Sequence, residues 1–328
     1  MEIVWTRSLS DPDAAAYDAF LESAPSGHYT QSRSWVELTA AAYPLRPRYF
    51  VARENGAVLG AAAVLKIAGL GAVVPVAWVE RGPAVRDVAA LGPVLQALHR
   101  ASRRHGNIYL RAMPYFANDD RGETESVLHR ERFRNVQKPT GSHAATLRVA
   151  VSGLSDEQIL EGSDRKKLRQ ELRNAAKAGA TVRRGGSGDV DVLAKLYGDL
   201  MIAQGQKSRP MRWWQALGER VGAEPGRYGL FLCEHAGAPL AATLAIRCGA
   251  RASYVMGAAA PGKLPFSKSA LSVFEAIRWA RDAGCVEFDM GGIPIPEDAD
   301  EKRVAIARFK HDFAKEPVAL VREHARWF

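Results

Sequence analysis

Two stretches near the C-terminus combine residue types that suit catalysis. The first, Asp289-Met-Gly-Gly-Ile-Pro294, is predicted to end a strand in paired glycines, where another molecule can approach the backbone closely. The second, Arg308-Phe309-Lys310-His-Asp-Phe313, sets a lysine between aromatic residues, where loss of hydration would change its affinity for a proton. Taken alone, the same residues also fit a turn and an amphipathic helix whose lysine reaches water along apolar surface. The rest of the chain decides between the two.

Composition indicates an ordinary globular protein of two domains. The chain has 328 residues, with 47% hydrophobic and 25% charged residues, against a prior of roughly 150 residues per domain. No segment approaches the ~20 apolar residues of a membrane span, and the N-terminus lacks a signal-peptide pattern, so we expect a cytoplasmic protein. Cys233, Cys248 and Cys285 fit neither a disulfide framework nor a zinc site. We expect buried thiols and no metal.

The charge of the chain favours a polyanionic partner. Its net charge is +9 and its pI about 9.6, which suits nucleic acid, a nucleotide-linked substrate or an anionic membrane surface. On a helix, four cations at every fourth position would form one ridge: Arg165, Arg169, Arg173 and Lys177. Like charges at this spacing repel, so an anionic ligand would stabilise the ridge. A solvated surface helix explains the pattern equally well.

Strand-like and helical segments alternate along the chain, which predicts a mixed α/β (α+β) fold. In the first half, helices are expected at 12–23 and 31–42, strands at 48–53, 58–67 and 76–85, then a helix to about 104 and a strand at 107–113. The second half repeats the later part of this order: strands at 227–234, 240–247 and 251–258, a helix ending at Gly284, and a strand at 285–290. We infer two similar domains, 1–150 and 151–328.

Two further stretches could bind phosphate. Arg183-Arg-Gly-Gly186-Ser-Gly188 matches the pattern by which acetyl-coenzyme A transferases hold pyrophosphate, but the expected place for that loop is 257–267, which lacks it. We therefore interpret 183–188 as a loop between strand and helix. Residues 204–214 combine Arg209 with Trp213 and Trp214, which could grip a phosphate and stack on a base or sugar. A helix beginning at Pro210 with at least one tryptophan in the core is the alternative.

Together these stretches resemble the FemABX peptidyltransferases, which transfer an amino acid from aminoacyl-tRNA to the amine of a peptidoglycan precursor's stem peptide. The resemblance follows the order of the motifs: Tyr29-Thr-Gln-Ser-Arg-Ser-Trp35, the basic stretch 168–183, Gly205-Gln-Lys-Ser-Arg-Pro210 with the paired tryptophans, Tyr254-Val-Met-Gly257, Phe288–Pro294 and Arg308-Phe309-Lys310. Met256, Gln206 and the tryptophans at 213 and 214 depart from the family pattern. These departures leave the acceptor open.

The resemblance implies two tandem acetyltransferase-like (GNAT-like) domains, FemX-like and without the coiled-coil insertion of some members. The N-terminal domain would bind the acceptor and the C-terminal domain would carry the transfer site. Lys310 and Phe309 would be catalytic, and the ridge would bind tRNA. The remaining implied substrate-binding residues are Arg33, Arg209, Trp213, Trp214, Tyr254 and Asp289.

We therefore expect aminolysis of an aminoacyl-tRNA ester by a peptide amine, with Lys310 stabilising the developing oxyanion. Asp289 would act as a base only if desolvation raised its pKa, and otherwise it caps a loop. The expected partners are aminoacyl-tRNA as co-substrate, a UDP- or lipid-linked muropeptide or another peptide amine, and peripherally the inner membrane surface; the protein is expected to be a monomer without a cofactor. Alternatives are an acyl-coenzyme A dependent N-acyltransferase, a tRNA-dependent ligase for a secondary-metabolite peptide, and a non-enzymatic RNA-binding protein.

Overall fold

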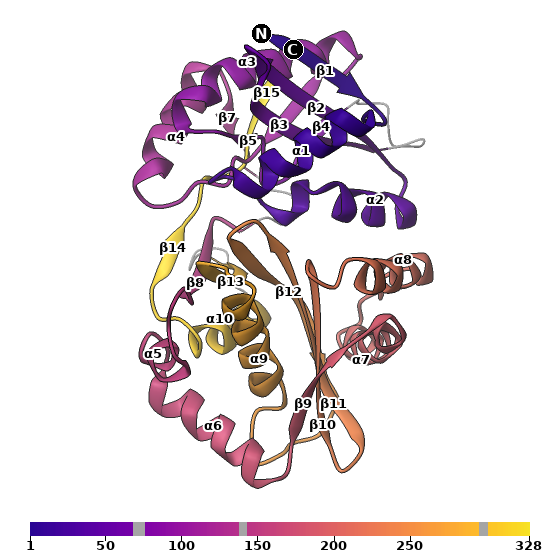
Figure 1. The fold of residues 1–328 in the computed structure, drawn as a ribbon, viewed down its shortest axis with the longest axis vertical. Helices are drawn as coiled ribbons and strands as arrows, with labels where there is room; N and C mark the ends of the chain where they lie inside the picture. Colours follow the sequence, from indigo (N-terminus) through magenta and orange to yellow (C-terminus); the bar gives the residue numbers. More distant parts are fainter. Residues whose placement is uncertain (68–75, 138–142, 295–300) are drawn as a thin grey trace. The chain divides into compact units, whose positions relative to one another are not determined.

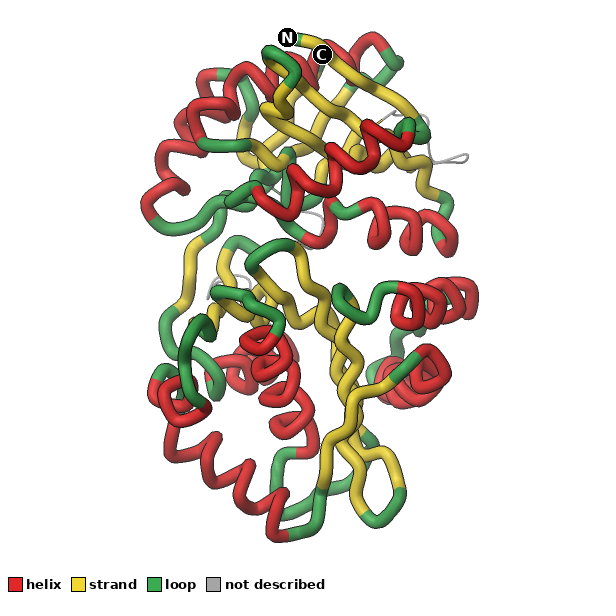
Figure 2. Tube along the Cα trace, viewed as in Figure 1, coloured by secondary structure: helices red, strands yellow, loops and turns green. Residues whose placement is uncertain are grey.

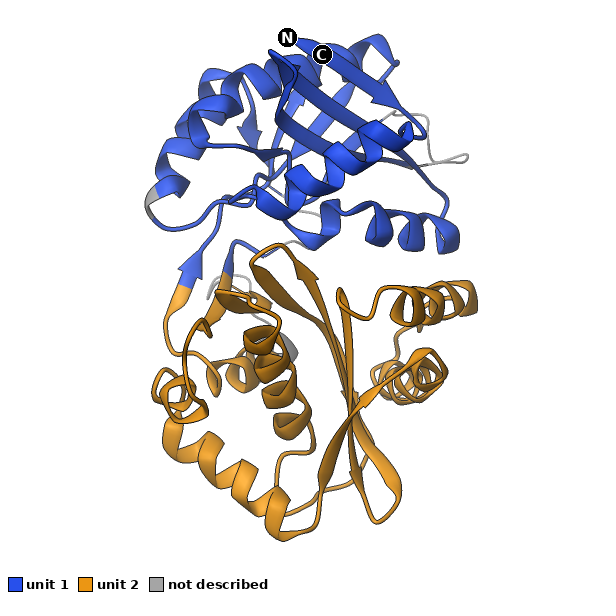
Figure 3. Ribbon diagram, in the orientation of Figure 1, with its two compact units in different colours: residues 1–145, 318–328 blue, residues 146–317 orange. Residues whose placement is uncertain are grey.

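The computed structural model describes residues 1–67, 76–137, 143–294 and 301–328. The chain forms two compact units, residues 1–145 with 318–328 and residues 146–317 (Figure 3). Each unit combines a sheet with flanking helices (Figure 2), as the alternating pattern predicts. The division differs from the predicted second domain of 151–328 at the C-terminal end. Residues 318–328 return to the first unit because strand β15 (His324–Trp327) pairs with two strands of that unit's sheet.

The first unit is built on a sheet of order β1-β2-β3-β4-β6-β15-β7, with β5 paired to β3. Its other strands are β1 (Glu2–Thr6), β2 (Leu45–Glu54), β3 (Ala57–Ile67), β4 (Val76–Val79), β5 (Ala84–Val85), β6 (Tyr109–Ala112) and β7 (Arg134–Asn135). Its helices are α1 (Asp11–Ser23), the 3-10 turn η1 (Tyr29–Gln31), α2 (Arg33–Ala42), α3 (Val88–Arg104) and α4 (Asp119–Arg130). The predicted single strand 76–85 is two strands, because Arg81 has a φ of 51° and cannot continue an extended chain.

Local sequence explains how the N-terminal motif fits into this unit. The Gln31 side chain is buried and bonds two strand segments, donating to the Glu80 carbonyl at 2.5 Å and accepting from the Ala63 N–H at 2.8 Å. Ser32 caps α2 by accepting from the Trp35 N–H at 3.3 Å. The segment from Gln31 to Trp35 therefore fixes the start of α2 against the sheet.

The second unit has a sheet of order β14-β8-β13-β12-β11-β10-β9. Its strands are β8 (Ala145–Ala150), β9 (Thr181–Gly185), β10 (Tyr228–His235), β11 (Ala238–Cys248), β12 (Arg251–Ala259), β13 (Glu287–Ile293) and β14 (Pro317–Ala319). Its helices are α5 (Asp156–Glu161), α6 (Arg165–Lys177), η2 (Ser187–Asp189), α7 (Val190–Ala203), α8 (Met211–Ala223), α9 (Lys268–Asp282) and α10 (Glu301–His311). Helices α7 and α8 cover one face of the sheet, and α9 lies against the other (Figure 1). All three cysteines are buried free thiols, as expected.

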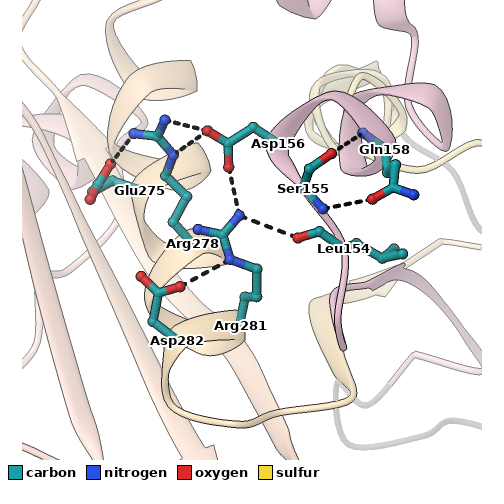
Figure 4. A network of polar contacts seen from close by, with 8 residues as sticks. All are labelled: Leu154, Ser155, Asp156, Gln158, Glu275, Arg278, Arg281 and Asp282. Carbon is teal, nitrogen blue, oxygen red and sulfur yellow. Dashed lines mark hydrogen bonds and ion pairs between the residues drawn. The ribbon is translucent and has the colours of Figure 1, made fainter.

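An ion-pair network fixes α5 against α9 (Figure 4). Asp156, the first residue of α5, accepts from Arg278 Nε at 2.9 Å and from Arg281 Nη1 at 2.7 Å. Because the two arginines lie three positions apart on α9, both reach the same carboxylate. Ser155 and Gln158 complete a capping box at the same helix start. The network joins the segment that leads into the basic helix α6 to the core of the unit.

Candidate active site

Lys310 lies on the buried side of α10, with its ammonium against the end of β13. Its side chain is only 8% exposed, and Nζ donates to the Gly292 carbonyl at 2.8 Å. The ammonium also lies 5.8 Å from the centre of the Tyr254 ring, on β12. Burial lowers the pKa of Lys310 to about 8, an effect that the charge of Asp289 opposes. An ammonium has three N–H groups, so it can also bond a substrate oxygen.

The paired glycines of β13 make room for this lysine. Gly291 has a φ of 73°, and a Cβ there would lie 3.1 Å from the Tyr254 carbonyl and 3.4 Å from Lys310 Nζ. A side chain at this position would therefore strain the backbone and crowd the ammonium. The predicted close approach at the strand end is filled by Lys310 itself.

Asp289 holds the shape of the strand end. It is 2% exposed, and its Oδ1 accepts from the Thr146 hydroxyl at 2.5 Å and from the Gly291 N–H at 2.7 Å. These bonds fit the alternative of a capping residue, and they also keep a carboxylate close enough to influence the charge of Lys310. Thr146 was missed in the sequence, since 143 positions separate it from its partner.

Tyr254 lies beside the Lys310 ammonium and is itself influenced by further aromatic residues. Burial and the neighbouring Tyr197 raise the pKa of Tyr254 above its usual range. Its hydroxyl packs on Gly257, where a Cβ would lie only 2.5 Å away. Tyr197 in turn packs edge-on against Trp214, with ring centres 5.6 Å apart. Residues from β12, α7 and α8 thus support one another behind Lys310.

Phe309 faces a different side of α10 from Lys310. Its ring packs edge-on against Phe313, with ring centres 5.3 Å apart. Both line a cavity of about 310 Å³ whose walls come from α6, the start of α9 and α10: Lys167, Leu168, Glu171, Ser267, Ala270, Ala305, Arg308, Phe309, Asp312 and Phe313. The Phe309 and Lys310 side chains are thus adjacent in sequence but serve two surfaces of one helix.

Trp213 and Trp214 are buried, and so they are not exposed for the expected stacking on a substrate. Trp213 is fully buried and Trp214 is 3% exposed, and their rings pack edge-on at 4.9 Å. The helix does begin at Met211 after Pro210, and its apolar face takes both indoles into the core. The Arg209 guanidinium carbon lies 4.4 Å from the centre of the Trp213 ring. Trp213 therefore orients Arg209, and Arg209 remains the candidate contact to an anion.

Arg33, in the first unit, is engaged by an acid. Its Nη2 and Nε bond the Asp18 carboxylate at 2.6 and 3.1 Å, and this hydrogen bonding raises the pKa of Arg33. A two-pronged carboxylate contact neutralises the guanidinium. A phosphate-binding role for Arg33 therefore stays a prediction, and a phosphate would have to displace the Asp18 carboxylate.

Helix α6 presents the predicted basic ridge, but acids of α5 partly neutralise it. Arg165 pairs with Glu157 and Glu161 at 3.6 Å, and Arg169 pairs with Glu157. Within the described part of the chain, Arg173 and Lys177 have no carboxylate partner. The C-terminal half of the ridge is thus the half available to a polyanion.

The glycine-rich stretch at 183–188 folds as the interpretation of a strand-to-helix loop requires. Arg183 bonds Asp189 at 2.6 Å and Glu234 at 2.8 Å, and the Gly186 N–H donates to Asp189. In the loop between β12 and α9, Lys268 donates to three carbonyls, those of Ala260, Pro261 and Gly262, at 2.6 to 2.9 Å. Among the residues described, no three His, Cys, Asp or Glu side chains are grouped to hold a metal ion.

No helix among the described residues combines the length and the apolar character that crossing a bilayer requires.

Comparisons with known proteins concern the family and the fold of the chain. The FemAB family model matches residues 13–220, and an acetyltransferase (GNAT) domain model matches residues 162–303. Solved structures with similar folds include FemX, with a TM-score of 0.84 and 17% identity over 100% of this chain and 98% of that one. L-PGS from Bacillus licheniformis has a TM-score of 0.60 and 14% identity over 96% and 92% of the two chains.

A tandem GNAT protein from the clavulanic acid biosynthesis pathway has a TM-score of 0.55 and 14% identity over 99% of this chain and 98% of that one. At these identities the likeness concerns the fold, and it confirms the expected GNAT-like architecture. A search of curated proteins gave no match. Because the FemAB model covers more than half of the residues, the chain belongs to the FemAB family, with a FemX-like fold, and is an acyl- or aminoacyltransferase.

Proposed function

We propose that this protein transfers an amino acid from aminoacyl-tRNA to an amine of a peptide acceptor, in particular the stem peptide of a peptidoglycan precursor. The observation that carries the proposal is the buried Lys310 ammonium at the Gly291-Gly292 strand end. Membership in the FemAB family supports an aminoacyl donor. The reaction belongs in the cytoplasm, and the enzyme acts as a monomer.

In the proposed reaction, the acceptor nitrogen forms a bond to the ester carbonyl carbon. The bond from that carbon to the tRNA ribose oxygen then breaks, and the proton lost by nitrogen ends on the ribose oxygen. Lys310 donates to the carbonyl oxygen while it carries negative charge, which lowers the barrier most when the site excludes water. An ester is converted to an amide, so no ATP is needed.

Asp289 acts in this scheme through Lys310. The charge of Asp289 favours the ammonium form of Lys310. The hydrogen bonds that its Oδ1 accepts from Thr146 and Gly291 fix the strand end. The proton passes from the attacking amine to the leaving oxygen within the substrates. A general base from the protein is not required.

The donor and acceptor have separate candidate anion contacts. Arg209, held on Trp213, suits a phosphate of a UDP- or lipid-linked acceptor. Arg173 and Lys177 of α6 suit the tRNA backbone, and two such contacts would give a salt slope of roughly −1.4 in log affinity against log salt. Reversing both charges should remove that slope; an unchanged slope would make α6 a solvated surface.

A peripheral contact with an anionic membrane is part of the proposal, and four cations of the first unit support it. Arg46 lies opposite Lys66 in the β2–β3 register, and Arg48 and Arg7 are their neighbours. Burial, together with the other cations, lowers the pKa of both Arg48 and Lys66. Within the described residues, no carboxylate pairs with any of the four. An anionic surface would relieve this repulsion.

The deciding experiment mixes purified protein with charged tRNAs and UDP-linked muropeptide and follows the acceptor by mass. We expect a mass increase of one aminoacyl group, abolished by ribonuclease and lost in Lys310→Met, while the exposed-site control Lys315→Met stays active. A product made with acyl-coenzyme A and no tRNA would replace the proposal with the coenzyme A reaction. Anion binding without any product would identify an RNA-binding protein.

A further inference from the structure

Arg81 is a buried cation in the first unit, in the turn between β4 and β5. Its residue surface is only 7% exposed, and its φ of 51° lies in the left-handed region. A residue other than glycine, asparagine or aspartate rarely adopts this backbone, and doing so costs about 1–3 kcal/mol. The fold therefore holds a charged side chain in a buried place with a strained backbone.

The contacts of Arg81 with the residues that the structure describes are neutral. Its Nη2 donates to the His143 carbonyl at 2.9 Å, and its Nη1 lies 3.9 Å from the Met113 sulfur. Its guanidinium carbon lies 5.5 Å from the centre of the Tyr115 ring. Within the described residues, no carboxylate forms an ion pair with it. A buried guanidinium without an anion is unfavourable, and five N–H groups leave donors beyond these contacts.

A series of ring contacts begins at Tyr115, which lies beside Arg81. Tyr115 packs against His28, with ring centres 4.6 Å apart, and His28 packs against Tyr29 at 4.5 Å. Trp35 meets Tyr29 edge-on at 5.1 Å. The His28 ring is fixed by a 2.9 Å hydrogen bond between Nδ1 and the Thr30 hydroxyl. A cation beside a row of such rings suits a ligand that joins an anionic group to an apolar or planar part.

We propose that Arg81 and the rings of Tyr115 and His28 form a binding site for an anionic group, a carboxylate or a phosphate, of a small ligand. The planar guanidinium matches either oxyanion through paired N–H bonds. Arg33 cannot fill this role as readily, because Asp18 already occupies it. If the proposed function holds, the ligand is the acceptor, and its terminal carboxylate or its phosphate supplies the anion.

Isothermal titration of the full chain tests this site without tRNA or catalysis. The probes are acetyl-alanyl-alanine, the same dipeptide as its C-terminal amide, and inorganic phosphate. We expect one anionic probe to bind at least about tenfold more tightly than the amide, the loss typical of a missing charge-assisted bond. The carboxylate and phosphate arms distinguish the two sources of the anion.

Arg81→Gln should lose that preference, whereas Arg53→Gln, which removes an arginine already paired with Asp13, should keep it. Equal binding of amide and anions by the wild type, or wild-type anion binding by Arg81→Gln, would overturn the proposal. Should Arg81→Gln fail to fold, the Arg81 Nε–H resonance of the wild type decides, since it must shift when the anionic probe is added. Because binding is measured alone, its failure leaves the proposed transfer reaction intact.

Discussion

Replacing Lys310 by methionine should abolish transfer and at the same time stabilise the second unit. Lys310 is 8% exposed, and burial lowers its pKa from 10.5 to about 8. The folded state therefore holds an ammonium that would be better solvated in the unfolded chain. Such a residue costs stability wherever it is charged, which is the cost expected of a residue that serves the proposed reaction.

The size of the effect follows from the shift. One pKa unit corresponds to about 1.4 kcal/mol, so the depression from 10.5 to about 8 amounts to about 3.5 kcal/mol. Methionine has a similar length and needs no hydration, but it leaves the Gly292 carbonyl without its donor, which costs about 1 kcal/mol. We therefore expect the free energy of unfolding of Lys310→Met to be about 2 kcal/mol higher than that of the wild type at pH 7. The rate of transfer should fall at least about 100-fold.

The pH dependence has a defined sign. Below pH 8 both states carry the charge and the full cost applies. Between pH 8 and 10.5 the unfolded state binds more protons than the folded state, so the stability of the wild type rises with pH. The advantage of Lys310→Met should therefore shrink between pH 7 and 9.5.

Urea unfolding at pH 7 and 9.5 measures the difference in stability between Lys310→Met and the wild type. The exposed Lys315→Met is the control for loss of one surface charge. The reasoning fails if Lys310→Met is less stable than the wild type at pH 7, or if its advantage is the same at both pH values. The first result would mean that the contacts with Gly292, Asp289 and Tyr254 outweigh the loss of hydration. The second would mean that burial does not lower the pKa of Lys310 in the folded state.

Other predictions concern both units. The kcat/KM of transfer to an amine that is already neutral at pH 6 should fall as pH rises through about 8, since the Lys310 ammonium is lost; a flat profile to pH 9.5 would exclude the ammonium. Gly291→Ala should lose at least about tenfold in activity and about 1–2 kcal/mol in stability, whereas Gly262→Ala, with a φ of 90° but nothing near its Cβ, should lose stability alone. Asp156→Asn should cost about 1 kcal/mol at pH 7, because its partners are partly exposed. Hydrogen bonding to Arg278 lowers the pKa of Asp156, so this stability is present above the ordinary value of 3.8 and lost as pH falls through the lower folded value; wild type and variant should converge in acid unfolding. Finally, alanines at Arg46, Arg48 and Lys66 should reduce sedimentation with phosphatidylglycerol vesicles by about 100-fold, while alanines at the exposed Lys195, Lys263 and Lys315 should not; equal loss in both would mean that net charge alone acts.

The sequence by itself determined the local features of this protein. Period and turn residues predicted the strands at 48–53 and 58–67, the ends of helices near 104 and at Gly284, and two α/β units. Paired glycines at the end of a strand predicted a close approach there, and the position of Lys310 between Phe309 and Phe313 predicted a poorly hydrated lysine. These features depend on residues a few positions apart, so their spacing is enough to reveal them.

Tertiary structure alone decided what each charged or aromatic side chain meets. Trp213 and Trp214 have the composition of a stacking site, but the apolar face of α8 buries them. Arg33 and Arg81 are alike in sequence, yet Asp18 neutralises the first, and the second lies buried among neutral groups. Residues 318–328 belong to the first unit because hydrogen bonds of β15 with β6 and β7 outweigh chain order. The sequence records which groups can ionise or stack, whereas burial and the partners brought from distant positions determine whether they do.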